Sequence, residues 1–169
     1  MQSDALRALQ APLKERYREA PQHALVTLTA TGTLDDDVAC NVQTGRALAT
    51  AGLHPATGGD GSLLCSGDML LEALVACAGV TLRAVATALE IPIAAGTVTA
   101  RGELDFRGTL GVDKQAPVGF TSIALRFDLD APHASEEQLA TLLKLTERYC
   151  VVLQTLRTAP GLTAELVPG

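Results

Sequence analysis

Tryptophan is absent from this sequence, aromatic residues make up only 3% of it, and lysine and arginine together number 13. A core must therefore be built from Ala, Leu and Val, and a hydrophobic share of 47% is enough to fill one and to exclude disorder. The net charge of −6, without basic clusters or interleaved aromatics, argues against nucleic acid or an anionic membrane surface as a partner.

Targeting and membrane-spanning segments are not expected either. The first 20 residues are charged and amphipathic, and they lack the apolar core of a signal peptide. The longest uncharged helical stretch, residues 73–82, is too short to span a bilayer. We therefore expect a soluble cytoplasmic protein with no membrane partner.

Sequence signals for metals and nucleotides are missing. The four cysteines are Cys40, Cys65, Cys77 and Cys150. They form no CxxC motif and no histidine lies at ligand spacing from them, which argues against a zinc site. The acidic run Asp35–Asp37 lacks the ligand spacing of a calcium loop, and the glycine-rich segment 52–67 lacks the Lys-Ser/Thr of a phosphate loop. The sequence thus predicts no cofactor and no metal.

Hydrophobic periodicity predicts an α+β fold with a mostly antiparallel sheet and two main helices on one face. Residues 1–20 are expected to hold an N-terminal helix, and residues 21–169 a single domain. Alternation with period two predicts strands, and a turn is expected at 33–37. The strands are expected at 24–30, 38–42, 46–50, 97–106, 122–130 and 162–166.

The helix expected at 68–90 is apolar around nearly its whole circumference, with Ser66 or Asp68 as its cap. A single small sheet cannot cover such a helix, so we predict a homodimer in which it packs near the twofold axis. The second helix is expected to begin after Ser135 as N-cap and to continue until Pro160. Tyr149 is expected at a helix or dimer interface.

Two cysteines lie on the apolar faces of these two helices, Cys77 in the first and Cys150 in the second. They can meet if the helices touch, although for each cysteine taken alone a small core residue is the favoured interpretation. Cys65 is either an incidental loop thiol or a third redox cysteine, and Cys40 is expected in the core. His54 is either an exposed loop residue or a general base.

Three segments of the chain, with a glycine-rich loop between the first two, resemble the OsmC/Ohr family of thiol-dependent organic hydroperoxide reductases. They are GRALATAG, SGDMLLEALVACAGVTLRAVA and EEQLATLLKLTERYCVVLQTL. The resemblance extends roughly from His23 to the C-terminus. It implies an intertwined homodimer with active sites at the subunit interface, with Cys77 as the peroxidatic and Cys150 as the resolving cysteine. It also implies a lipoyl-type dithiol as reductant, and Arg46 matches the arginine that activates the thiolate in the Ohr branch.

A cation is what the chemistry of Cys77 requires. A free thiol with a pKa of about 8.5 is only a few per cent thiolate at neutral pH, and apolar surroundings raise that pKa. Cys77 also lies too deep in its helix for the helix N-terminus to help. Arg46 is therefore the first candidate to stabilise the thiolate, and Arg83 the second.

Two positions differ from the family pattern. Val151 follows Cys150, where family members often carry proline. The helix-start glutamate of the family has no identical match, and Asp68, nine positions before Cys77, is the nearest acid. Asp68 is expected to be a capping or first-turn acid and Glu72 a helix-surface acid.

The sequence thus supports two hypotheses. In the first, the Cys77 thiolate reduces an organic hydroperoxide to an alcohol, Cys150 forms a disulfide with the resulting sulfenic acid, and a dithiol restores both thiols. In the second, the same dimeric scaffold binds a small apolar or acyl ligand without peroxide turnover.

Overall fold

The computed structural model describes residues 2–5, 8, 11, 19, 31–35, 39–44, 47–111 and 113–168, with side chains described from residue 49 onward and at the N-terminal positions. The described positions among residues 3–19 are helical, as expected for the N-terminal helix. Arg46, the predicted strand at 24–30 and the side chain of Cys40 lie outside the described part.

The first sheet has the strand order β1-β2-β3-β4. Its strands are β1 (Thr31–Asp35), β2 (Ala39–Thr44), β3 (Ala47–Gly52) and the short β4 (Leu64–Cys65). The first three form an antiparallel meander, as predicted, and β4 runs parallel to β3. The turn predicted at 33–37 is wrong in its first half, because β1 pairs with β2 as far as Asp35. A 3-10 turn at Pro55–Thr57 lies in the glycine-rich segment.

The second sheet consists of β5 (Ala95–Leu104) and β6 (Phe120–Asp130), which pair antiparallel with Val98 opposite Phe127. The short helix α3 (Phe106–Thr109) lies in their connection, where the sequence pattern had predicted the end of a strand. Among the described residues the strands therefore form two separate sheets rather than the one predicted.

Helix α2 (Ser66–Ala88) is the long apolar helix expected from the sequence. Its N-cap is Cys65, which makes no side-chain cap hydrogen bond, so the predicted caps Ser66 and Asp68 are wrong. Its buried residues follow a spacing of four along one face: Leu74, Ala78, Leu82 and Ala86. The opposite face is open in the single chain, where Val80 is 72% exposed.

By length and composition alone, α2 would also be able to cross a bilayer, contrary to the estimate from the shorter uncharged stretch. A core helix of a soluble protein passes the same test. The contacts of α2 with β5, α4 and α5 favour a core helix.

The second helical region is divided into α4 (Glu136–Tyr149) and α5 (Val151–Arg157). Ser135 caps α4 in a capping box with Gln138, as predicted. The single helix predicted beyond it is wrong, because Cys150 has extended backbone angles (φ −71°, ψ 105°) and ends one helix while beginning the next. The aromatic and β-branched neighbours of Cys150 have low helix propensity, which favours a break there.

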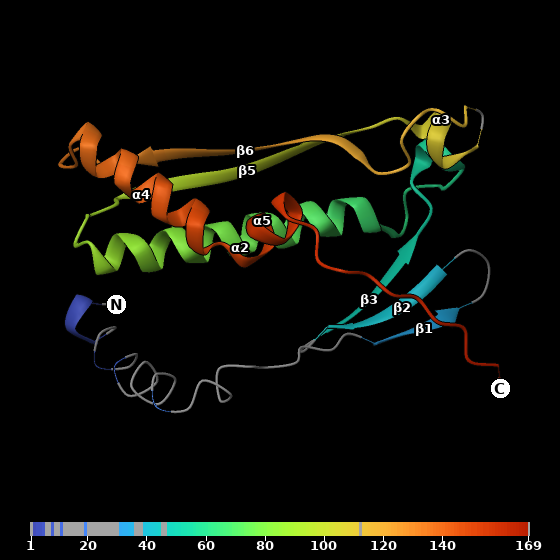
Figure 1. The fold of residues 1–169 in the computed structure, drawn as a ribbon, viewed down its shortest axis with the longest axis horizontal. Helices are drawn as coiled ribbons and strands as arrows, with labels where there is room; N and C mark the ends of the chain where they lie inside the picture. The colour runs from blue at the N-terminus through green and yellow to red at the C-terminus, as the bar shows by residue number, and fades with distance from the viewer. Residues whose placement is uncertain are drawn as a thin grey trace.

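Figure 1 shows α2 lying along the β5–β6 hairpin, with α4 and α5 beside α2 and the first sheet at one end of the molecule. Contacts of Leu82 with Leu142, and of Ala78 with Cys150, show that α2 and α4 run antiparallel. The last strand predicted at 162–166 is wrong. Residues 159–168 have no regular secondary structure, and Leu162 and Leu166 are 85% and 91% exposed.

Candidate functional site

Cys77 and Cys150 lie together where α2 meets the α4–α5 break. Leu74, Ala78 and Cys150 are each 0% exposed and form one apolar cluster. Cys77 is half-buried and packs against this cluster, close enough to Cys150 for each thiol to shift the pKa of the other. The structure thus brings together the two cysteines that the sequence analysis singled out.

The break at Cys150 shapes the surroundings of both sulfur atoms. The first N–H groups of a helix have no partner within that helix, so the start of α5 presents free donors beside the thiols. On the other side of the break, the carbonyl of Glu147 accepts a hydrogen bond from the Gln154 amide at 2.7 Å. In an uninterrupted helix, these N–H groups and the Glu147 carbonyl would take part in the backbone hydrogen bonds of the helix itself.

Hydrogen bonds decide the ionisation of Cys77. Partial burial raises the pKa of its thiol, but hydrogen bonds to the sulfur outweigh burial and the pKa lies below the usual value. In order of effect, they come from the N–H of Val152, the thiol of Cys150, the hydroxyl of Thr81 and the N–H of Val151. Within the described part of the chain, no cationic side chain contributes to this lowering.

Cys150 behaves in the opposite way. Burial raises the pKa of the Cys150 thiol, and the N–H groups of Leu153 and Val152 do not offset that effect. The hydrogen bond and the charge of Cys77 raise this pKa further. The pKa shifts of the two thiols therefore have opposite directions, lowered for Cys77 and raised for Cys150, which suits a nucleophile and its resolving partner.

We expect iodoacetamide to modify Cys77 well before Cys150 near neutral pH. The thiolate is the reactive form, and of these two cysteines only Cys77 combines a lowered pKa with partial exposure. Peptide mass mapping against time and pH should give Cys77 a reaction midpoint below that of an ordinary cysteine. Modification of Cys150 first would reverse this assignment.

Thr146 places a buried polar group beside the thiols. It is 1% exposed, and its Oγ1 has no hydrogen-bond partner among the described residues. It lies one turn before Cys150, whose N–H donates to the Thr146 carbonyl at 2.9 Å. A buried hydroxyl without a partner costs about 1–3 kcal/mol, so this position is destabilising.

We therefore expect Thr146→Val to raise the free energy of unfolding by about 1 kcal/mol, because the shape is kept and the unpaired hydroxyl is removed. Urea denaturation would measure the change. Thr146→Ser keeps the hydroxyl and should bring no gain, and Thr141→Val on the exposed side of α4 should be neutral. A loss of stability in Thr146→Val would show that the hydroxyl has a partner in solution.

The other candidates from the sequence do not reach the thiol pair. Arg83 is exposed, and its Nη1 donates to the carbonyl of Ile93 at 3.1 Å. Cys65 precedes Cys77 by 12 residues, which is about 18 Å along a helix. Asp68 lies in the first turn of α2, and both it and Glu72 are exposed. Within one chain the structure therefore does not place Cys65 beside Cys77, and a third redox cysteine stays a hypothesis.

His54 and Tyr149 have structural environments of their own. The Nδ1 of His54 accepts a hydrogen bond from the N–H of Ala56 at 3.0 Å, and its ring stacks on Phe106 at 4.9 Å. Tyr149 is 58% exposed in the single chain, with the Arg148 guanidinium 5.7 Å from its ring centre. Among the residues that the structure describes, no three His, Cys, Asp or Glu side chains gather closely enough to hold a metal ion.

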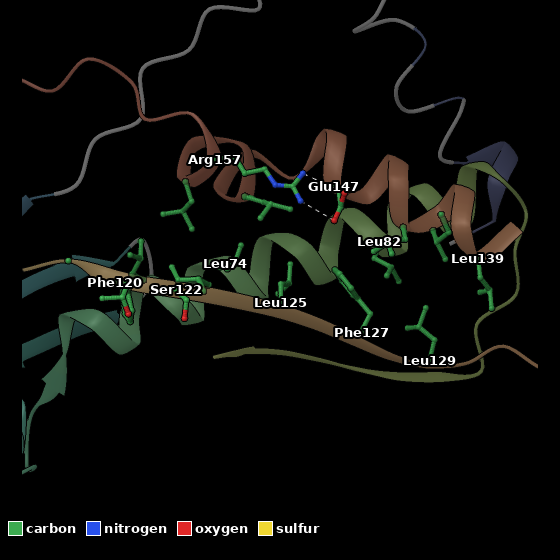
Figure 2. Close-up of a pocket in the computed structure, with 18 residues that line it drawn as sticks. Leu74, Leu82, Phe120, Ser122, Leu125, Phe127, Leu129, Leu139, Glu147 and Arg157 are labelled. Atoms are coloured by element: carbon green, nitrogen blue, oxygen red, sulfur yellow. Dashed lines mark hydrogen bonds and ion pairs between the residues drawn. The ribbon is translucent and has the colours of Figure 1, made fainter. Parts of the chain in front are cut away.

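An apolar groove of about 970 Å³ lies between β6 and the helices. Figure 2 shows Leu and Phe side chains from α2, β6 and α4 pointing into it, with Glu147 and Arg157 joined at its rim. Leu74 and Leu153 line the groove and also belong to the cluster around Cys150. The sequence analysis missed this groove, because its walls come from four separate elements, α2, β6, α4 and α5.

Comparisons with known proteins agree with this architecture. The family model described as OsmC-like protein matches residues 59–165, which is more than half of the chain. The chain therefore belongs to the OsmC-like family. A search of the curated proteins finds no significant match.

Solved structures share the fold at low sequence identity. An OsmC-like protein from Mycoplasma pneumoniae is 21% identical, with a TM-score of 0.65 over 79% of this chain and 89% of that one. An organic hydroperoxide resistance protein OsmC from Legionella pneumophila is 16% identical, with a TM-score of 0.61 over 79% and 91%. The organic hydroperoxide resistance protein OhrB of Bacillus subtilis is 17% identical, with a TM-score of 0.53 over 79% and 93%. These likenesses establish an α+β OsmC-like fold.

Proposed function

We propose that this protein reduces organic hydroperoxides to alcohols with Cys77 as nucleophile and Cys150 as resolving thiol. The observation that carries the proposal is the pairing of the two sulfur atoms in one apolar cluster, with the pKa of Cys77 lowered and that of Cys150 raised. Membership of a family that includes hydroperoxide resistance proteins supports it.

The reaction proceeds in three balanced steps. The Cys77 thiolate attacks the distal, hydroxyl-bearing peroxide oxygen and forms an S–O bond, the O–O bond breaks, and the alkoxide leaves and takes a proton to become the alcohol. The sulfenic acid on Cys77 then condenses with the Cys150 thiol, forming a disulfide and releasing water. An external dithiol of the lipoyl type reduces this disulfide by exchange and is itself oxidised. Such a reductant fits a cytoplasmic location.

Thr81 and the N–H groups of Val151 and Val152 stabilise the negative charge on the Cys77 sulfur before attack. Arg46 supplies the positive charge that these neutral donors lack, and it hydrogen-bonds the peroxide oxygen. The apolar surroundings formed by Leu74 and Ala78 favour organic hydroperoxides over hydrogen peroxide.

The active form is a homodimer with α2 near the twofold axis. The face of α2 opposite the Leu74–Ala78 stripe is left uncovered in one chain, and Val80 at 72% exposure lies on it. Only 28% of the most apolar stretch of α2 is buried in the single chain, although its composition is that of a core helix. A second copy would cover this surface.

A binding function without turnover is the second candidate, and the groove of about 970 Å³ favours it. Its size is near the upper end of the roughly 300–1,000 Å³ typical of small-molecule sites. In this alternative the groove would hold an acyl or other apolar ligand, and the thiols would be core residues.

Steady-state consumption of cumene hydroperoxide, fed by dihydrolipoamide, distinguishes the two candidates. The peroxidase proposal predicts many turnovers per chain, with hydrogen peroxide reduced much more slowly. Consumption no faster than in protein-free buffer would favour the binding function.

A further inference from the structure

The face of α4 that packs against α2 is a stripe of three residues spaced four apart. Leu142 is 1% exposed and packs with Leu82 of α2, and Cys150 is 0% exposed and packs with Ala78. Thr146 lies midway between Leu142 and Cys150 on the same side of the helix, so it is held in the same interface. Among the described residues, Thr146 is the only polar one that is buried.

The Thr146 hydroxyl is a donor without an acceptor. A helical threonine commonly satisfies its hydroxyl on the carbonyl one turn earlier, but Oγ1 of Thr146 has no partner there or elsewhere among the described residues. Leaving a buried hydroxyl unpaired costs stability, so its presence calls for an explanation. Such a donor is free to bind an acceptor that exists only during a reaction, and interactions of that kind accelerate a chemical step.

The sulfur of Cys150 is the acceptor that this hydroxyl can reach. The helical hydrogen bond from the Cys150 N–H to the Thr146 carbonyl, at 2.9 Å, keeps the two residues one turn apart. Side chains at this spacing have Cβ atoms roughly 5–6 Å apart, and a helical threonine has two χ1 rotamers open to it. A neutral thiol is a weak acceptor, whereas a thiolate attracts donors strongly. Burial disfavours the Cys150 thiolate and raises its pKa, so an added donor has most effect when that charge develops.

We propose that Thr146 is a catalytic residue of the resolving step, in which its hydroxyl donates a hydrogen bond to the Cys150 sulfur as that sulfur attacks Cys77. The role in peroxide reduction rests on the proposed function. In this step the S–S bond forms and the S–O bond of the Cys77 sulfenic acid breaks, so the Cys150 sulfur is oxidised and the Cys77 sulfur reduced. The proton of the Cys150 thiol leaves with the sulfenic hydroxyl as water, and Thr146 keeps its own proton throughout.

The disulfide reagent dithiobis(nitrobenzoic acid) tests the attack by Cys150 without any peroxide. One equivalent reacts with Cys77 and releases a coloured thionitrobenzoate, and Cys150 then attacks the mixed disulfide and releases a second. Absorbance follows both releases, and peptide mapping confirms the Cys77–Cys150 product. Thr146→Val should slow the second release about tenfold, the loss expected for one hydrogen bond to a charged group, and leave the first release unchanged. The same variant is expected to be the more stable protein, so unfolding would not account for the slower step.

Thr146→Ser keeps the hydroxyl and should restore the second release to near the wild-type rate, which a role in packing alone would not do. Thr141→Val, on the exposed side of α4, is the matched control and should leave both releases unchanged. A second release at the wild-type rate in Thr146→Val, or one as slow in Thr146→Ser, would overturn the proposal. A wild type that gives no second release would also overturn it. Turnover of cumene hydroperoxide, measured separately, distinguishes these failures from failure of the proposed function.

Discussion

Cys77→Ser should reduce the consumption of cumene hydroperoxide by at least about a thousandfold, to near the rate of dithiol alone. A serine hydroxyl is not ionised under these conditions, and removing the nucleophile of a covalent enzyme causes losses of this size or larger. The half-buried position of Cys77 tolerates serine, so circular dichroism should show an unchanged fold. The steady-state assay with dihydrolipoamide measures the effect.

Cys150→Ser and Cys65→Ser complete this test. Without Cys150 the sulfenic acid cannot form the internal disulfide, so about one equivalent of hydroperoxide should be consumed quickly before turnover slows. Cys65→Ser should behave as wild type, because Cys65 is the N-cap of α2 and lies several helical turns before Cys77. A loss in Cys65→Ser as large as that in Cys77→Ser would contradict the assignment of the nucleophile.

Arg46→Ala should slow alkylation of Cys77 at pH 7 by up to about 30-fold, with little change in melting temperature. This estimate assumes that the arginine lowers the thiol pKa by about 2.5 units from 8.5, which changes the thiolate from a few per cent to most of the population. The rate of iodoacetamide modification, followed by mass spectrometry between pH 5 and 9, measures this change.

The direction of the pH dependence is fixed by the charge. A cation stabilises the thiolate, so removing it raises the pKa and moves the alkylation profile to higher pH. Arg83→Ala is the matched control, since Arg83 hydrogen-bonds the Ile93 carbonyl and does not reach the thiols. If the Arg46→Ala profile coincides with that of the wild type, the hydrogen bonds from Thr81 and the α5 N–H groups activate Cys77 without it.

The elements best predicted from the sequence were those with strong local signals. The apolar run of α2, the capping box at Ser135 and the alternation of β5 and β6 are properties of neighbouring residues, and each appears in the structure. The thiol pair was predicted from helix faces together with the family resemblance. Its roles, and that of Arg46, remain predictions.

What the sequence did not predict depends on contacts between distant segments. At the break at Cys150, backbone groups bond outside the helix: the Glu147 carbonyl accepts from the Gln154 side chain, and the N–H groups of Val151 and Val152 face the Cys77 sulfur. No local sequence pattern shows these contacts. The 162–166 segment alternates like a strand but has no partner strand in the described chain. The Glu147–Arg157 ion pair joins α4 to α5, which the sequence had predicted as one continuous helix. The buried Thr146 hydroxyl, which has no hydrogen-bond partner among the described residues, is likewise a feature of tertiary packing.

Peptide mapping after one equivalent of cumene hydroperoxide, under non-reducing conditions, tests the central claim most directly. The account predicts the loss of two hydrogens and a single cross-linked peptide pair that joins Cys77 to Cys150. A cross-link through Cys65, or an irreversibly oxidised Cys77 with Cys150 still free, would contradict it.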